Sequence, residues 1–244
     1  MPHPLDSATS DVPLLVRLLD GFGLDIGHHA VVLPVHAQRV LAFLALSRLF
    51  GTAQRRTALA ERLWCEGSHE RAQASLRTAI WRIRQADGRL VHADRRHVHL
   101  GNRVEVDVER SLGQAERLLA EDGDLAPADA ATAGLTADLL PDWEEDWLMV
   151  ERERIHQVRI QALVALSQRL CGLGRFMPAL DAAYTAIAAE PLHESAHAAL
   201  VEVHLAEGNV TQARRHVDGY ARLLWAEMRL RPSNALVAKV GGPR

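Results

Sequence analysis

The feature that most constrains this chain is a helical pattern from Ser68 to Asp87, apolar on one side and rich in arginine on the other. The apolar side consists of Ala72, Leu76, Ala79, Ile80 and Ile83, at the spacing of one helix face. The opposite side carries Glu70, Arg71, Ala74, Arg77, Thr78, Trp81, Arg82 and Gln85. The apolar face predicts packing on a core. A tryptophan on the polar face predicts that this face also has a partner, because a large indole is costly to leave in water.

A short basic hairpin is predicted directly after this helix. Residues 90–92 and 97–100 alternate between apolar and polar side chains around a tip that contains Arg95 and Arg96. From Arg71 to Arg103, eight arginines stand against two acidic residues. Arginines beside small, hydroxyl and aromatic side chains suit the base edges and phosphates of a DNA major groove. Helix and hairpin together favour a winged helix that binds double-stranded DNA over a solvated face that packs on another domain or a dimer partner.

The charge of the chain is divided unevenly. Residues 1–104 hold 14 basic and 9 acidic side chains, a net charge of +5, whereas residues 105–244 hold 14 and 22, a net charge of −8. This split is typical of a DNA-binding module joined to a protein-interaction module. No stretch has the roughly 18 apolar residues that span a membrane, and the first residues do not resemble a signal peptide. We therefore expect a cytoplasmic, nucleoid-associated protein.

The pattern along the chain predicts three regions. Residues 1–13 are expected to be a disordered leader, residues 14–104 a winged helix, and residues 105–244 an all-α domain. Within the winged helix we expect strands at 14–19 and 31–33, turns at Gly21, Gly23 and Gly27, and helices at 36–47 and 56–64, before the helix and hairpin described above. A helix over 107–120, a loose connection over 121–138 and continuous helices from Trp143 complete the prediction.

The helical region repeats itself with a period of 34 residues. The shift aligns three pairs of alanines, one pair of leucines and one pair of glycines: Ala162 with Ala196, Ala165 with Ala199, Leu166 with Leu200, Gly174 with Gly208, and Ala179 with Ala213. Small residues allow two antiparallel helices to pack closely, and this period is that of the tetratricopeptide repeat. The predicted fold is mainly α: an N-terminal α+β winged helix followed by a tetratricopeptide-like helical repeat domain.

Five segments carry a resemblance to a known family. Glu61–Gly67 (ERLWCEG) and Ser75–Gln85 (SLRTAIWRIRQ) resemble an OmpR-type winged helix. Leu139–Ile155, Gly174–Asn209 and Tyr220–Ser233 resemble the bacterial transcriptional activation domain. Together, in this order, they are similar to the antibiotic regulatory protein (SARP) family, in its small two-domain form.

The resemblance implies a transcription activator, typically of secondary-metabolite genes. Such a protein would bind direct repeats in promoter DNA as a homodimer and recruit the RNA polymerase holoenzyme. Two alternatives stay open: a repressor, and a helical-repeat adaptor in which the winged helix is a scaffold. One departure from the family concerns the end of its last long helix, usually Glu-Leu-Gly, which here reads Glu227-Met228-Arg229. Loss of that glycine removes an easy left-handed helix cap.

The resemblance and the helix pattern together indicate which residues contact DNA. The recognition helix would present Arg71, Ala74, Ser75, Arg77, Thr78, Trp81, Arg82 and Gln85. Phosphates, and the groove reached by the wing, would be contacted by Arg56, Trp64, Arg84, Arg95 and Arg96. The small side chain of Ala74 would favour apolar contact with a thymine methyl group.

Enzyme chemistry has little support in the sequence. Thirteen histidines are present, but His92, His97 and His99 do not complete a zinc ligand set. No phosphate loop, dinucleotide turn or nucleophile elbow occurs. The cluster of Asp142, Glu144, Glu145 and Asp146 is interpreted as a solvated helix start rather than a catalytic pair. We expect no enzyme activity, no cofactor, no metal ion and no membrane partner.

Overall fold

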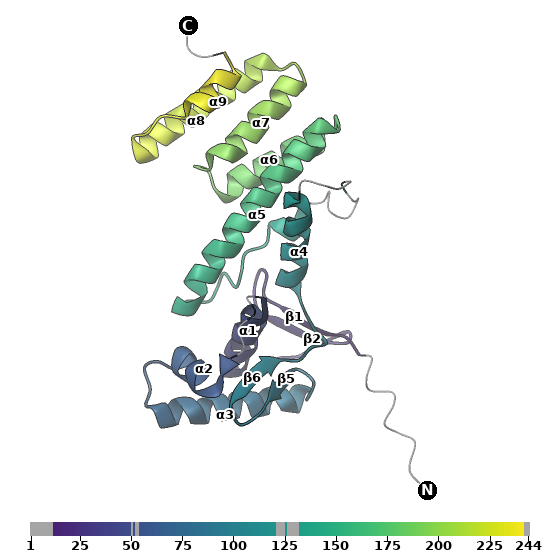
Figure 1. Cartoon of the computed structure of the whole chain (residues 1–244), viewed down its shortest axis with the longest axis vertical. Helices are drawn as coiled ribbons and strands as arrows, with labels where there is room; N and C mark the ends of the chain where they lie inside the picture. Colours follow the sequence, from purple (N-terminus) through teal and green to yellow (C-terminus); the bar gives the residue numbers. More distant parts are fainter. Residues whose placement is uncertain (1–11, 50, 52–53, 121–124, 126–131, 242–244) are drawn as a thin grey trace. The chain divides into compact units, whose positions relative to one another are not determined.

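The computed structural model describes residues 12–49, 51, 54–120, 125 and 132–241. They form two compact units (Figure 1). The first comprises residues up to Arg110 together with Asp138–Arg152, and the second comprises Ser111–Ala137 and Glu153–Arg244. The predicted fold class is confirmed: a small N-terminal α+β region is followed by packed helices. None of the described helices is long and apolar enough to cross a membrane.

A four-stranded sheet opens the first unit. Its strands are β1 (Leu14–Arg17), β2 (Gly23–Ile26), β3 (His29–Ala30) and β7 (Val104–Val106), in the order β3-β2-β1-β7. Strand β1 is antiparallel to β2 and parallel to β7. The predicted strand at 31–33 and the turn at Gly23 are wrong, because β2 begins at Gly23 and β3 ends at Ala30. The turn between β2 and β3 begins at Gly27, whose φ of 62° suits glycine.

Three helices and a second sheet follow. The helices are α1 (Val35–Leu49), α2 (Arg56–Leu63) and α3 (His69–Ala86), and the strands are β4 (Gln54–Arg55), β5 (Val91–Ala93) and β6 (His97–Leu100), ordered β4-β6-β5. The predicted helices and hairpin are confirmed. The side chain of Ser68 caps α3 by accepting a hydrogen bond from the backbone N–H of Arg71 at 3.4 Å. The five apolar residues predicted for the inner face of α3 are all buried.

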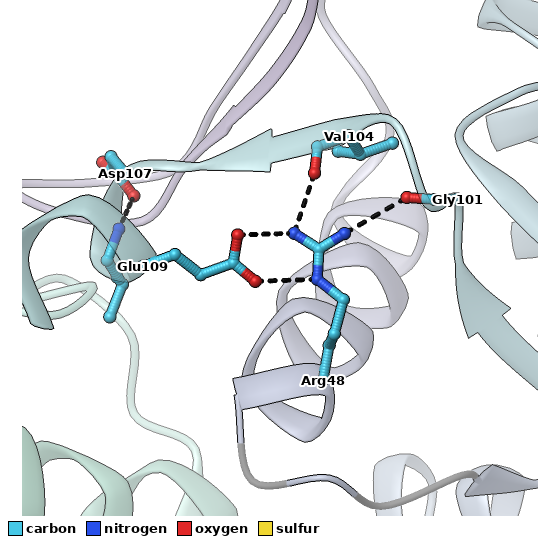
Figure 2. Close-up of polar contacts among 6 residues, drawn as sticks. Arg48, Gly101, Val104, Asp107 and Glu109 are labelled. Carbon is cyan, nitrogen blue, oxygen red and sulfur yellow. Dashed lines mark hydrogen bonds and ion pairs between the residues drawn. The ribbon is translucent and has the colours of Figure 1, made fainter. Parts of the chain in front are cut away.

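Arg48 joins three segments of the first unit at the end of α1 (Figure 2). Its guanidinium contacts both carboxylate oxygens of Glu109 at 2.7 and 2.8 Å, and donates to the carbonyls of Gly101 and Val104 at 3.2 and 2.8 Å. Glu109 lies in the first turn of α4 (Asp107–Leu119). The carboxylate of Asp107 accepts hydrogen bonds from the backbone N–H groups of Leu18 and Leu19. The start of α4 is therefore fixed to the residues that follow β1 and to α1 of the first unit.

The segment Asp138–Arg152 is part of the first unit. Asp20 donates its backbone N–H to the Asp138 carbonyl at 2.7 Å. Further along the segment, Glu145 forms an ion pair with Arg39 at 2.7 Å, and the rings of Trp147 and Phe43 meet edge to face at 5.0 Å. The compact units therefore do not divide at residue 104, where the change in composition places the domain boundary.

The second unit is a stack of helices. It contains most of α5 (Asp146–Gly172), then α6 (Phe176–Ala189), α7 (Glu194–Ala206), α8 (Val210–Met228) and α9 (Asn234–Lys239). Helix α7 packs against both α6 and α8. Of the predicted loose connection, residues 121–124 and 126–131 lie outside the described residues, as do residues 1–11 of the predicted leader. A short 3-10 helix, Ala133–Leu135, lies within the described part of the connection.

The 34-residue repeat corresponds to two helical hairpins. Gly174 lies between α5 and α6, and Gly208 lies between α7 and α8, with φ angles of 71° and 80°. Four of the aligned alanines are fully buried, namely Ala162, Ala179, Ala196 and Ala213. The equivalent glycines thus make equivalent left-handed turns, and the equivalent alanines pack where the helices approach closely.

Candidate nucleic-acid interface

The outer face of α3 is exposed, as the sequence predicts. Trp81 is 51% exposed and lies opposite the buried side chains of the same helix. The Arg82 guanidinium lies 4.8 Å from the centre of the Trp81 ring, at cation–π distance. Apart from half-buried Ser75, the other predicted recognition residues are also exposed: Arg71, Ala74, Arg77, Thr78 and Gln85. The face combines planar cations, one large ring and small side chains.

Thr78 and Ala74 form a small pair in the middle of this face. The Thr78 hydroxyl donates a hydrogen bond to the Ala74 carbonyl at 3.1 Å. With that proton committed to the helix, Thr78 can offer a DNA base only an oxygen lone pair and a methyl group. These groups complement the amino group of adenine or cytosine, or the methyl group of thymine.

A group of guanidinium charges lies where α2, α3 and the wing meet. Burial lowers the pKa of Arg56 below its usual range, and the positive charges of Arg77 and Arg84 lower it further. Arg56 donates to the Asp94 carbonyl at 3.3 Å, and Arg84 donates to the Ala93 carbonyl at 3.2 Å. These bonds fix the wing to both helices. The mutual repulsion of three cations is a physical reason for the cluster to bind an anion.

The tip of the wing is organised by Asp94. Its carboxylate accepts hydrogen bonds from the backbone N–H groups of Arg96 and His97 at 2.6 and 2.7 Å. These two hydrogen bonds lower the pKa of Asp94 below its usual value, and the bond from His97 has the larger effect. The carboxylate thereby stabilises the turn, and the side chains of Arg95 and Arg96 are left exposed.

Trp64 lies in different surroundings from the other predicted DNA contacts. Its ring is half-buried and lies 5.8 Å from the Arg39 guanidinium. It lines a cavity of about 690 Å³ whose wall also contains Glu144, Glu145 and Asp146. The same wall contains Arg39, Arg62 and Arg71, so acidic and basic side chains are mixed around Trp64. The predicted phosphate contact of Trp64 stays a prediction, with less geometric support than that of Arg56.

One residue beside the α3 face was not singled out from the sequence. His36, in the first turn of α1, lines a hollow of about 320 Å³ together with Ala74, Ser75 and Thr78. Its Nε2 atom is buried and has no hydrogen-bond partner among the residues that the structure describes. No sequence signal marks His36, because the contact joins residues that are distant along the chain.

The comparisons with known proteins agree with this architecture. A solved structure, "Mycobacterium tuberculosis EmbR in complex with low affinity phosphopeptide", is similar with a TM-score of 0.77 and 17% sequence identity, covering 96% of this chain and 67% of that chain. At this identity the likeness concerns the fold. The curated proteins include no match. Residues 104–239 match the family model described as the bacterial transcriptional activator domain. The match spans more than half of the residues of this chain. The chain therefore belongs to the bacterial transcriptional activator domain family.

Proposed function

We propose that this protein is a sequence-specific DNA-binding transcription activator that acts as a dimer on direct repeats in promoters of secondary-metabolite genes. The observation that carries the proposal is the position of the outward arginines of α3. They lie on the same unit as the arginines of α2 and the wing, with a buried apolar face behind them. The helical repeat would supply the contact with RNA polymerase. Family membership supports regulation of transcription, and the SARP resemblance supports the kind of promoter.

In the proposed complex α3 enters the major groove. Arg56, Arg77 and Arg84 would hold backbone phosphates beside the groove, and Arg95 and Arg96 would extend the phosphate contact from the wing. Phosphate contacts fix the register of a protein on the duplex but carry no sequence information. Sequence would be read by Arg82, whose planar fork can bind the O6 and N7 atoms of guanine. Thr78 and Ala74 would add the small contacts described above.

Two alternative functions, a repressor and an adaptor, make different predictions about the DNA-binding face and the polymerase contact. A repressor would use the same DNA face without the polymerase contact, and an adaptor would not use the DNA face at all. The exposed arginines favour a face that binds DNA. In a scaffold without a bound anion, a cluster of mutually repelling cations would only destabilise the fold. Under this proposal the protein has no enzyme activity, binds no cofactor and is located in the cytoplasm.

Binding to a promoter fragment at rising salt concentration tests the proposal. If Arg56, Arg77, Arg84, Arg95 and Arg96 each neutralise a phosphate, the log–log slope should be about −4 to −5, at roughly −0.9 per contact. Replacing Arg56 and Arg84 with Gln should make the slope shallower by about 2. Replacing Arg110 and Arg175, which are exposed elsewhere, with Gln gives a matched control with unchanged slope. Salt-independent binding, or no protection of DNA, would contradict the proposal.

A further inference from the structure

The outer side of α8 carries a row of basic and aromatic side chains. Arg215 and Arg222 are seven residues apart, which puts them on one side of the helix, and Arg229 continues the row at its C-terminal cap. Trp225 lies beside the row and is 49% exposed, with the Arg229 guanidinium 5.9 Å from its ring centre. Together with exposed Met228 and Leu230, these residues are named the α8 strip.

The charges of the α8 strip are not neutralised within the part of the chain that the structure describes. Its three guanidinium groups have no ion-pair partner there, although Asp218 and Glu227 lie on the same helix. Arginine and tryptophan are also the residues that most often dominate the binding energy of protein interfaces. Two large apolar side chains at the end of the strip provide area that would gain from burial.

A surface of complementary character lies in the first unit, at the start of α5. Asp142, Glu144 and Asp146 are exposed, and Met149 and Val150 are exposed beside them. Asp146, Met149 and Val150 share one helix face, because they are three and four residues apart. We name these five residues the acidic segment. Glu145 is not included, because its carboxylate is bound to Arg39 and to the Trp147 indole N–H.

We propose that the α8 strip of one copy binds the acidic segment of a second copy. Three cations would meet three carboxylates, none of which has an ion-pair partner among the described residues, and Trp225, Met228 and Leu230 would cover Met149 and Val150. Such a contact joins two different surfaces and is therefore head-to-tail. Unlike a two-fold symmetric contact, it allows both copies to have the same orientation, which is what direct repeats in DNA require. The inference rests on the proposed dimer on DNA and identifies the surfaces that form it.

Paired charge reversals in the full chain test this interface. One variant carries Arg222→Glu and Arg229→Glu, and the other carries Glu144→Arg and Asp146→Arg. Each variant alone would bring like charges together, so its self-association should weaken at least about tenfold. In an equimolar mixture, the first variant keeps a wild-type acidic segment and the second keeps a wild-type α8 strip. The mixture should therefore regain association at equal stoichiometry and near wild-type affinity, measured by sedimentation.

Controls separate this contact from folding defects and from DNA binding. Arg110→Glu with Arg175→Glu makes the same change in charge elsewhere and should self-associate like the wild type. Arg222→Gln with Arg229→Gln is a milder substitution and should weaken association less than the reversal. Affinity for DNA with a single half-site should be unchanged in every folded variant. If the wild type does not bind this DNA either, the proposed function fails. The self-association measurements still test the interface, because they do not depend on DNA binding.

Several results would overturn the interface. These are a wild-type chain that stays monomeric both free and on two-site DNA, reversal variants that associate as the wild type does, and a mixture that stays monomeric although both variants are folded. Loss of single-site DNA affinity only in the Arg222→Glu, Arg229→Glu variant would assign the α8 strip to nucleic acid instead.

Discussion

At the scale of single residues, Arg77 and Arg82 lie on the same exposed face of α3 but in different surroundings. Arg77 is close enough to Arg56 to lower its pKa, so it belongs to the cationic cluster. Arg82 lies over the Trp81 ring, which restricts the orientation of its guanidinium plane. A restricted planar fork suits bidentate recognition of guanine, whereas a cluster of cations suits phosphate.

This difference predicts different losses on mutation. Arg82→Ala should cost about 1–3 kcal/mol of binding free energy on a cognate site and much less on random DNA. Arg77→Ala should weaken both complexes similarly and make the salt slope shallower by about 0.9. Equilibrium binding to both DNAs at several salt concentrations measures these effects. A uniform loss for Arg82→Ala would assign that arginine to phosphate.

Arg229 shows how a departure from the family pattern is accommodated. It caps α8 in the left-handed conformation, with φ 56° and ψ 26°, at the position where the family usually has glycine. Its backbone N–H still bonds to the Trp225 carbonyl at 3.1 Å. The left-handed turn is therefore retained without glycine, at a conformational cost of roughly 1–2 kcal/mol for a residue with a side chain.

Restoring the glycine should stabilise the second unit. Arg229→Gly would relieve the left-handed strain but would also increase the entropy of the unfolded chain, which offsets part of the gain. The expected net increase is about 0.5–1 kcal/mol in the free energy of unfolding, measured by urea denaturation. Arg231→Gly is the matched control, because Arg231 has no positive φ, and it should give no increase. A destabilised Arg229→Gly variant would show that its side-chain contacts outweigh the strain.

At the scale of elements, the α7–α8 hairpin contains a histidine pair. The rings of His197 and Tyr220 stack at 4.0 Å, and His197 Nδ1 lies 2.9 Å from His216 Nε2. His197 Nε2 lies 2.9 Å from the Pro191 carbonyl, which can only accept a hydrogen bond. His197 therefore carries a proton on Nε2, and when His197 is neutral its Nδ1 accepts a hydrogen bond from His216 Nε2. Burial lowers the pKa of His197, which favours this neutral form.

The pair makes the stability of this hairpin depend on pH. Burial, and then repulsion from His197 and His204, lower the pKa of His216 to about 4, and burial also lowers that of His197. Between this value and the unfolded pKa near 6.5, the unfolded chain binds more protons than the folded chain. The stability contributed by the neutral form is therefore present above about pH 6.5 and is lost as the pH falls towards 4.

The expected loss from His216 between pH 7 and 4 is on the order of 1–3 kcal/mol, reduced from the full shift because the ring is partly exposed. Urea unfolding of the wild type and His216→Gln across this range measures it, and the variant should show a shallower dependence on pH. His69→Gln, at an exposed histidine of the first unit, should leave the dependence unchanged. Parallel curves for the wild type and His216→Gln would contradict the assignment.

Elements in which apolar side chains recur at regular spacing could be predicted from the sequence. Elements that depend on partners distant along the chain could not. Helix α3 has five buried side chains at helical spacing and a serine cap, so its bounds differ from the prediction by a residue at each end. Strands β2 and β3 are short, and only Leu24 of their residues is buried, so alternation gives almost no signal. The predicted outward face of α3 is confirmed by exposure, whereas the hollow beside His36 depends on how α1 crosses α3.

At the scale of the whole molecule, the chain leaves the first unit after Arg110 and returns to it at Asp138. Composition and repeats could not predict this return, because Asp138–Arg152 has the acidic character of the second half. Its contacts with the first unit are specific: besides Arg39–Glu145 and Phe43–Trp147, the rings of Phe22 and Trp143 stack at 5.9 Å. The Arg152 guanidinium then bonds to the carbonyls of Leu139, Leu140 and Trp143. The first unit is thus completed by residues that the family model assigns to the activator domain.

Truncation tests whether this return is needed for the N-terminal α+β region to fold. A fragment of residues 1–104 loses Glu109, the ion-pair partner of Arg48, and Asp107, the acceptor for Leu18 and Leu19. It also exposes Phe43 by removing Trp147. These losses should destabilise it by about 3–5 kcal/mol relative to a fragment of residues 1–152. That is a large part of the stability of a small domain.

Thermal unfolding and DNA binding of the two fragments give the answer together. Residues 1–152 should melt cooperatively and bind single-site DNA, and Trp147→Ala in that fragment should lower the melting temperature towards that of residues 1–104. Residues 1–110 restore Asp107 and Glu109 without the returning segment, so they should melt between the other two fragments. Equal melting temperatures for residues 1–104 and 1–152 would contradict this prediction. They would mean that residues 1–104 fold completely without the returning segment, as the change in composition suggests.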